Sequence, residues 1–394
     1  MKDIAQNSSS SNIISLLLVV LVMPNNIAKP FTVLIISLIL ISQYRNILNA
    51  KYFQVKVILL VILLPGLVMT IYKDFEEVIR FMPILLMILM FPYSYIKINL
   101  RKILITSIVV LIYIIATQYL IGINNSSIIN LRNTYYPMET NIWNYGYLGE
   151  DSYVFDRQLR FGGIFYNPNV CASNVFMYFA CSIYALNSID NPLSKKIIFL
   201  LVVFFTFYSL FLTGSRTFIV GICVFMAIKY MNIYEILLKK KVGYQQLAYL
   251  ILLFSLLVYV IIIGFESVVE GLLSEGGSAN EKNEILIKYL QYMLSNDIST
   301  LIFGGAHKIQ FDADLGSIIG AFGILGFIGI GIFYIKCIQE ISDSVPFVLT
   351  VIIASIGNTI IYNLAASLQV FIVLVVVSQI NIYQNRYGRG QLQN

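Results

Sequence analysis

Charged side chains are scarce in this chain of 394 residues: they make up only 12% of it, whereas hydrophobic residues make up 58%. About a quarter of the residues in a soluble domain are charged, so the composition excludes a chain built from soluble domains. The net charge of +6 comes from basic residues scattered through short segments between apolar runs. A nucleic-acid-binding protein has its basic residues clustered instead, so no nucleic-acid partner is predicted.

Side chains that bind metals or cofactors are also rare. The only histidine is His307, and the four cysteines lie in apolar runs without a Cys-x-x-Cys pair. We therefore predict neither a metal site nor a redox site. There is no P-loop and no Rossmann glycine pattern, so no nucleotide cofactor is expected. The sequence also lacks a clear internal repeat and a small-residue cleavage site, so we predict neither an inverted-repeat transporter nor a cleaved signal peptide.

The sequence contains many apolar runs of about 17–25 residues. This is the length that crosses a hydrocarbon core. Lipid offers no hydrogen-bond partners to the backbone, so these runs are expected to be helices. We predict an all-α polytopic membrane protein, a single domain over 1–394 embedded in a lipid bilayer, with about twelve transmembrane helices. The predicted spans are residues 12–26, 28–44, 56–72, 79–96, 102–122, 164–187, 197–213, 216–236, 245–264, 313–335, 345–362 and 364–381.

The positions of Lys and Arg predict the orientation of these spans. With both termini in the cytoplasm, the inside loops hold most of the 26 basic residues and few of the 20 acidic ones. Two long loops, 123–163 and 265–312, then face the outside. Long loops in a compact protein are usually functional or disordered, and we expect these two to be ordered because the first is rich in tyrosine and the second contains an apolar helical face over 281–295. The polar tail after Ile382 is expected to be disordered.

The segment RFGGIFYNPN, residues 160–169, is the first candidate site, because it joins the first long loop to a span. Its two glycines permit a close backbone approach or a positive φ. Asn169 is expected to cap the helix that follows, and the free N–H groups of a helix start favour an anion. Arg160 beside such a start suits a phosphate, whose oxygens its planar fork can bind in pairs. The alternative is an interfacial arginine next to an ordinary Asn-Pro turn.

The second candidate is Thr213-Gly214-Ser215-Arg216, in a very short outside hairpin between two spans. An arginine in so short a loop must lie at or near the level of the bilayer, which is costly, so a functional role is the default hypothesis. Gly214-Ser215 is similar to part of a nucleophile elbow, but no histidine–acid pair accompanies it. Serine catalysis is therefore not predicted.

The third candidate is the segment FGGAHKIQFDADLGSIIGAFGILG, residues 303–326. It places Asp312 and Asp314 at the mouth of a span, where a carboxylate can act as a general base or orient a sugar hydroxyl. The alternative is a pair of solvated aspartates at a helix start. The glycines that follow, from Gly316 to Gly331, suggest close helix packing within the span.

All three candidates are predicted to face the outside at one level of the membrane, and two of them offer arginine. An outward basic pocket suits a lipid-linked phosphate or pyrophosphate. Because no nucleotide motif is present, the energy for any group transfer would come from the substrate itself.

These motifs, taken in order, give the sequence a family resemblance. RFGGIFYNPN at a span start, a later TGSR hairpin and a late Gly-x-x-Gly span after a long outer loop resemble the superfamily of O-antigen ligases and Wzy-type polysaccharide polymerases. The layout of about twelve spans with two long outer loops is also similar to that family. The resemblance covers most of the chain by layout but only about fifty residues by motif.

The resemblance implies a GT-C-like, metal-independent and inverting glycosyltransferase without a cofactor. Its substrates would be glycans linked to undecaprenyl pyrophosphate, at the outer face of the bacterial plasma (inner) membrane. Arg160 and Arg216 match the outward arginines that hold the pyrophosphate in this family, and Asn167 and Asn169 match its span-start motif. A chain-length regulator is the candidate protein partner.

Two departures from the family pattern bear on the reaction. Ligases typically carry a histidine eleven residues before the late Gly-x-x-Gly, where this chain has Asp312; His307, a candidate substrate-binding residue with Ser215, lies five residues earlier. This favours a polymerase over a ligase. The second long loop lacks the arginine that the family often has there, and Lys282 is the candidate to replace it.

We therefore predict an enzyme that polymerises lipid-linked repeat units into a surface polysaccharide such as O-antigen or capsule. Asp312 or Asp314 would activate or orient the acceptor hydroxyl. The alternatives are a ligase of the same fold or, from another class, a transporter or flippase of polysaccharide or lipid-linked oligosaccharide. A flippase would need charged residues along a central path, and the predicted span interiors are almost free of charge.

Overall fold

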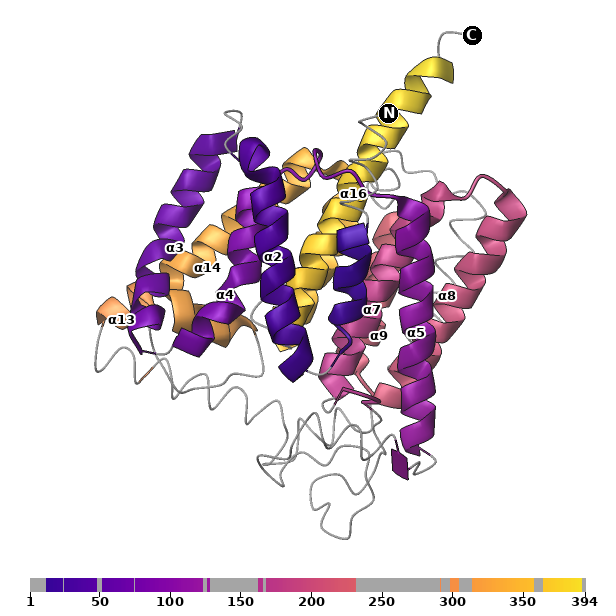
Figure 1. Cartoon of the computed structure of the whole chain (residues 1–394), viewed down its shortest axis with the longest axis horizontal. Helices are drawn as coiled ribbons and strands as arrows, with labels where there is room; N and C mark the ends of the chain where they lie inside the picture. Colours follow the sequence, from indigo (N-terminus) through magenta and orange to yellow (C-terminus); the bar gives the residue numbers. More distant parts are fainter. Residues whose placement is uncertain are drawn as a thin grey trace. The chain divides into compact units, whose positions relative to one another are not determined.

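A computed structural model of the whole chain describes residues 12–23, 25–47, 52–73, 75–122, 126–127, 162–165, 168–231, 291, 298–304, 314–357 and 364–391. These residues are almost entirely helical, and no strand occurs among them (Figure 1). The prediction of an all-α protein is confirmed for this part of the chain. Most of the two predicted long loops, 123–163 and 265–312, lies outside the described residues, so their order stays a prediction.

The helices have the following bounds. Residues 12–20 are helical, and the labelled elements are α2 (Asn25–Ile47), α3 (Phe53–Lys73), α4 (Phe75–Met90), α5 (Leu100–Gly122), α7 (Pro168–Ala185), η3 (Leu186–Ser188), α8 (Pro192–Thr213), α9 (Arg216–Met231), α13 (Ile298–Phe303), α14 (Asp314–Glu340), η4 (Ser342–Ser344), α15 (Val345–Gly357) and α16 (Leu364–Gln391).

Each predicted span overlaps one of these helices except 245–264, which lies outside the described residues. Within the described part, four segments are long and apolar enough to cross a membrane: Leu100–Ile121, Pro168–Ser188, Pro192–Thr213 and Ile318–Glu340. Shorter apolar helices accompany them. The chain is thus a helical protein whose long apolar helices are typical of a membrane-embedded protein. The number of spans and their orientation stay predictions.

Local sequence explains where α8 begins and ends. The Asn191 side chain accepts hydrogen bonds from the N–H groups of Leu193 and Ser194, at 2.9 and 3.2 Å, and Pro192 occupies the first helical position. This is the favoured chemistry of a helix start. At the other end Gly214 adopts φ 61°, and its N–H donates to a carbonyl of the last turn, as in a glycine-capped helix end.

The span predicted over 79–96 is shorter than expected, because α4 ends at Met90. Pro92 lacks an N–H and disfavours helical geometry at the residue before it. The chain turns there: the Tyr93 N–H donates to the Met90 carbonyl at 3.0 Å, and its phenol donates to the Met87 carbonyl at 2.9 Å. The next helix, α5, begins at Leu100.

The prediction of a disordered tail after Ile382 is wrong, because α16 continues to Gln391. Each residue added to an existing helix contributes one more backbone hydrogen bond, and no proline follows Ile382 to stop it.

Internal contacts divide the chain into two compact units. The first unit consists of Met1–Phe53, Pro83–Ser215 and Leu364–Asn394, and the second of Gln54–Met82 and Arg216–Asn363. Each unit is therefore assembled from segments far apart in the sequence. The prediction of a single membrane domain stays a prediction.

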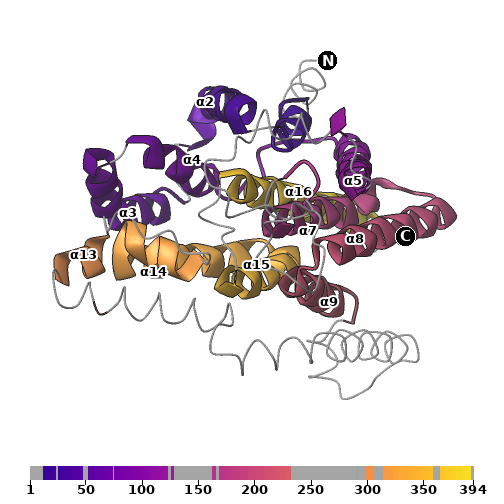
Figure 2. The same cartoon turned by 90° about the horizontal axis from the view of Figure 1, so that it is seen from below.

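In the first unit, α7 is the inner helix. Its side chains are buried from Cys171 to Ala185, and α5, α8 and α16 pack against it (Figures 1 and 2). By contrast, α8 leaves Leu200, Phe204 and Phe211 exposed. An uncovered apolar face on a long helix fits contact with lipid.

In the second unit, α13, α14, α15 and α9 lie in one row (Figure 2), each in contact with the next. The helix α3 packs on α14 through glycines. A Cβ atom on Gly66 would lie 2.7 Å from Cα of Phe322, and one on Gly329 would lie 2.9 Å from the Ile62 side chain. The expectation of close helix packing in the glycine-rich span is confirmed at these positions, whereas a Cβ on Gly331 would meet nothing within 4 Å.

Candidate functional site

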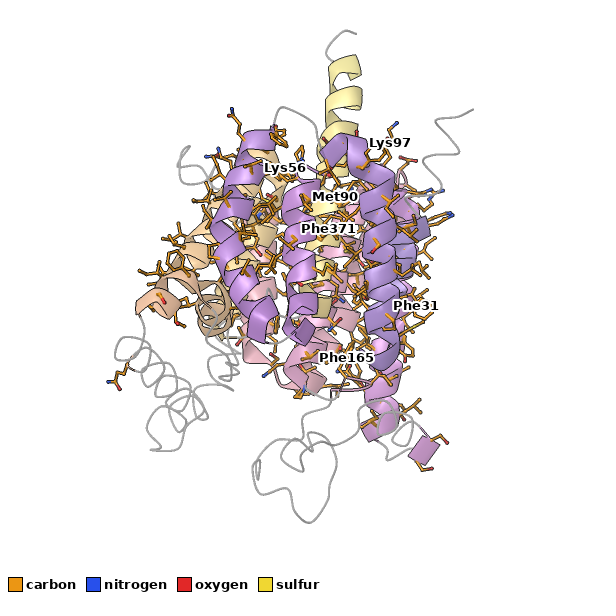
Figure 3. The ribbon with its side chains drawn as sticks, turned by 60° about the vertical axis from the view of Figure 1, so that its left-hand side comes forward. Phe31, Lys56, Met90, Lys97, Phe165 and Phe371 are labelled. Carbon is orange, nitrogen blue, oxygen red and sulfur yellow. The ribbon has the colours of Figure 1, made fainter. Side chains whose placement is uncertain are left out.

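Residues from two of the candidate motifs lie at one end of the first unit. Figure 3 shows Phe165, from the first motif, at the opposite end of this unit from Lys97. The chain leaves the Lys97 end along α5, enters α7 just after Phe165, and returns along α8 to the hairpin at Gly214. The last turn of α5, the first turn of α7 and the last turns of α8 therefore share one end of the bundle.

A buried amide joins these three helix ends. Gln118 of α5 is 1% exposed, and its Oε1 accepts a hydrogen bond from the Ser209 hydroxyl of α8 at 2.7 Å. Its Nε2 donates to the Ser209 carbonyl at 3.2 Å and to Sγ of Cys171, in α7, at 3.5 Å. An unpaired amide in the interior costs about 1–3 kcal/mol, so these bonds tie the three helices to one arrangement.

The neighbouring residue of α5 holds the turn that leads into α7. Oγ1 of Thr117 accepts a hydrogen bond from the Ile164 N–H at 3.3 Å and donates to the Ile114 carbonyl at 2.8 Å. Gly163 adopts φ 61°, and a Cβ there would lie 2.8 Å from Thr117 Oγ1 and 3.2 Å from the Gln118 backbone nitrogen. The expected positive φ and close approach are confirmed at Gly163.

A second buried amide pair lies one turn further along α7. Nε2 of Gln369, in α16, donates to Oδ1 of Asn174 at 2.5 Å. Nδ2 of Asn174 donates in turn to the Val170 carbonyl at 2.8 Å. Both amides are fully buried. Amides and hydroxyls of this kind are uncharged, so they hold helices in place and orient one another, and they are not suited to proton transfer at neutral pH.

The TGSR hairpin is as tight as predicted. After the Gly214 cap, the Ser215 N–H donates to Oγ1 of Thr213 at 3.3 Å, and α9 begins at Arg216. Ser215 is only 3% exposed. Its burial fits a residue that shapes the hairpin, and whether it also binds substrate stays a prediction.

The structure describes the predicted site residues unevenly. Arg160, Asn167, Lys282, His307 and Asp312 lie outside the described residues. The backbones of Arg216 and Asp314 begin α9 and α14.

Asn169 is not the helix cap that we expected. α7 begins at Pro168, so Asn169 is its second residue, and it is half-buried. Proline is favoured at the first helical position because its φ is already fixed and its missing N–H would have had no helical partner. The start of α7 therefore lies earlier than the predicted cap requires.

The third candidate segment contains a crossing of two backbones in the second unit. Gly323 interrupts α14 with φ 69° and ψ −175°, and Gly304 follows α13 with φ 87°. A Cβ on Gly304 would fall on the backbone of Ala321, and a Cβ on Gly323 on the backbone of Ile302. The sequence predicted glycine packing here but not the interruption of the helix.

Sequence reasoning also missed the buried amides. Gln118 and Gln369 lie inside apolar segments, and Asn174 lies near the start of another. Polar side chains in such segments tend to face neighbouring helices and bond across them. That rule would have singled out these residues, although not their partners.

No protein-family model matches the chain, and no curated protein matches it significantly.

Proposed function

We propose that the protein polymerises oligosaccharide repeat units linked to undecaprenyl pyrophosphate, at the outer face of the bacterial plasma membrane. The observation that supports this proposal is that two chain segments are held against α5 at one end of the first unit. Ile164, from RFGGIFYNPN, bonds Thr117 near the end of α5, and a Cβ on the preceding Gly163 would press on the same side chain. Ser209, about two turns before the TGSR hairpin ends, bonds the next residue, Gln118. The proposal includes a GT-C-like fold with about twelve spans.

In this proposal Arg160 and Arg216 bind the donor pyrophosphate. An arginine fork can bind two phosphate oxygens at once, and fixed positive charge stabilises the negative charge that develops on a leaving group. The other residues proposed for the substrate site are Asn167, Asn169, Ser215, His307 and Lys282.

The proposed reaction balances without a cofactor. The acceptor hydroxyl forms a bond to the anomeric carbon of the donor sugar, and the bond from that carbon to the pyrophosphate oxygen breaks, with inversion. Asp312 or Asp314 takes the hydroxyl proton as a general base. The pyrophosphate leaves on its lipid, so the substrate supplies the energy.

Alanine variants of the two arginines test the proposal. In Arg160→Ala and Arg216→Ala cells we expect surface polysaccharide with single repeat units and no long chains, because polymerisation fails while ligation continues. Arg101→Ala is the matched control, since Arg101 is exposed at the opposite end of α5 and its loss should leave the ladder unchanged. Loss of all decoration would indicate a ligase, and an unchanged ladder in both variants would refute the pyrophosphate clamp.

A transporter or flippase is the second candidate, and the interruption of α14 at Gly323 favours it. Discontinuous helices form the substrate sites of many transporters. Here, however, backbone from Ile302 to Gly304 fills the interruption, as in a packed crossing. Loss of a flippase would leave lipid-linked repeat units on the cytoplasmic side, whereas loss of a polymerase leaves them outside, and protection from an added glycosidase in intact spheroplasts distinguishes these outcomes.

A further inference from the structure

Gln118 is a buried side chain that links three helices at the candidate site. Its oxygen and its nitrogen are both engaged: the oxygen with the Ser209 hydroxyl, the nitrogen with the Ser209 carbonyl and Cys171. One amide thus joins α5 to both α7 and α8. A buried hydrogen-bonded group of this kind has a defined geometry, because any shift of one helix leaves a polar atom unpaired.

The residues that Gln118 contacts lie close in the sequence to the two candidate arginines. Ser209 lies in the last turns of α8, which lead directly into the hairpin that carries Arg216. A Cβ on Gly163 would lie 3.0 Å from Cγ of Gln118, and Gly163 is three residues from Arg160 in the sequence. The same side chain therefore lies against the turn that leads into α7 and bonds the last turns of α8.

We infer that Gln118 is a positioning residue, which fixes the spacing between the turn at Gly163 and the end of α8 that the proposed reaction requires. This inference rests on the proposed function. Gln118 does not touch the substrate and acts through the segments that it joins. Because a misplacement of about 1 Å can reduce a rate on the order of a hundredfold, loss of the link should slow turnover.

Gln118→Met removes the hydrogen bonds and keeps the length and approximate volume of the side chain. The matched control is Gln379→Met, the same substitution in the same unit, on α16. Gln379 is partly buried, and its Nε2 has no hydrogen-bond partner among the described residues. It lies ten residues beyond Gln369 along α16, away from the candidate site.

The first measurement is the turnover of purified protein in nanodiscs with lipid-linked repeat units as substrate. For Gln118→Met we expect kcat to fall on the order of tenfold or more with little change in KM, because each segment still binds but the two no longer act together. Gln379→Met should keep both parameters. Only monodisperse protein is assayed, so a loss of folded protein does not imitate a fall in kcat.

The second measurement does not depend on activity. Spin labels are placed at Tyr119→Cys and Phe211→Cys, because Tyr119 and Phe211 are 57% and 69% exposed on α5 and α8. Their distance distribution is recorded by double electron–electron resonance. We expect a narrow distribution for the parent and for Gln379→Met, and a broader one for Gln118→Met.

The outcomes separate this inference from the proposed function. An unchanged distance distribution, or a broader one with unchanged kcat, would overturn the positioning role. If the proposed function is wrong, the arginine variants show it instead: Arg160→Ala and Arg216→Ala cells would still make polysaccharide of full length. A broader distribution with reduced kcat supports the inference.

Discussion

The two units hold irregular backbone in place by different means. In the first, the turn before α7 rests on side chains: Thr117 binds the Ile164 N–H, and Gln118 binds two further helices. In the second, the interruption of α14 rests on backbone, because Gly304 and Gly323 each lie against the main chain of the other segment.

This difference has a physical consequence. A side chain can rotate or be replaced, so an arrangement built on side chains tolerates small changes. Two backbones in contact cannot move apart without moving their helices, so a backbone crossing tolerates almost none. We therefore expect mutations of the crossing to affect stability more than mutations of the buried amides and hydroxyls of the first unit.

Gly323→Ala should have the largest effect. The new Cβ would overlap the Ile302 backbone, and φ 69° is a conformation that alanine rarely adopts. Strain and overpacking together predict a destabilisation of about 3–5 kcal/mol. The measurement is the temperature at which half of the detergent-solubilised protein leaves the monodisperse peak in gel filtration.

Gly331→Ala is the control for that variant on the same helix. A Cβ there meets nothing within 4 Å, and alanine favours a helix by up to about 1 kcal/mol over glycine. Its stability should stay the same or rise. Equal losses in the two variants would refute the backbone crossing.

Gly163→Ala should have an intermediate effect. The positive φ of 61° costs alanine about 1–2 kcal/mol, but the closest atom to the new Cβ is Oγ1 of the Thr117 side chain, which can move. The same thermal assay measures the loss. In a Thr117→Ala background, where that oxygen is gone, the further loss on Gly163→Ala should be smaller, because only the contacts with Gln118 and the cost of φ remain.

The sequence predicted the helices better than it predicted what joins them. Apolar runs located the long described helices, because the need to cross lipid constrains whole segments, whereas the short α13 fell in a predicted loop. The end of α4 before Pro92 follows from proline chemistry, although the predicted span extends beyond it. The interruption at Gly323 could not be predicted from the sequence. A glycine inside a regular helix and a glycine that breaks a helix can have the same neighbouring residues.

The candidate site was predictable only in part. The Gly163 turn followed from the local preferences of glycine. The partnership of Gln118 with Ser209, 91 residues away, depends on how three helices pack, and hydrophobic periodicity carries no information about pairs of polar side chains. The roles of Arg160 and Asp312 stay predictions, because both lie outside the described residues.

Asn174→Leu should cost about 1–3 kcal/mol, because it leaves the Nε2 group of Gln369 without its acceptor in the interior. Gln369→Leu should cost a similar amount for the converse reason. The double variant should lose less than the sum of the two, since replacing both partners leaves no unpaired amide. Additive losses in the thermal assay would contradict the pairing.

Ser107→Ala should have the smallest effect and completes the comparison. Ser107 is fully buried in α5, and its hydroxyl has no hydrogen-bond partner among the described residues. A buried polar atom without a hydrogen bond costs desolvation free energy that nothing offsets. Removing it should therefore lower the stability by no more than about 0.5 kcal/mol, or raise it. Ser209→Ala is the matched variant, because that hydroxyl donates to Gln118, and it should lose about 1 kcal/mol or more. If the two serine variants behave alike, the buried amide of Gln118 does not stabilise this end of the bundle, and the contrast between the two units fails.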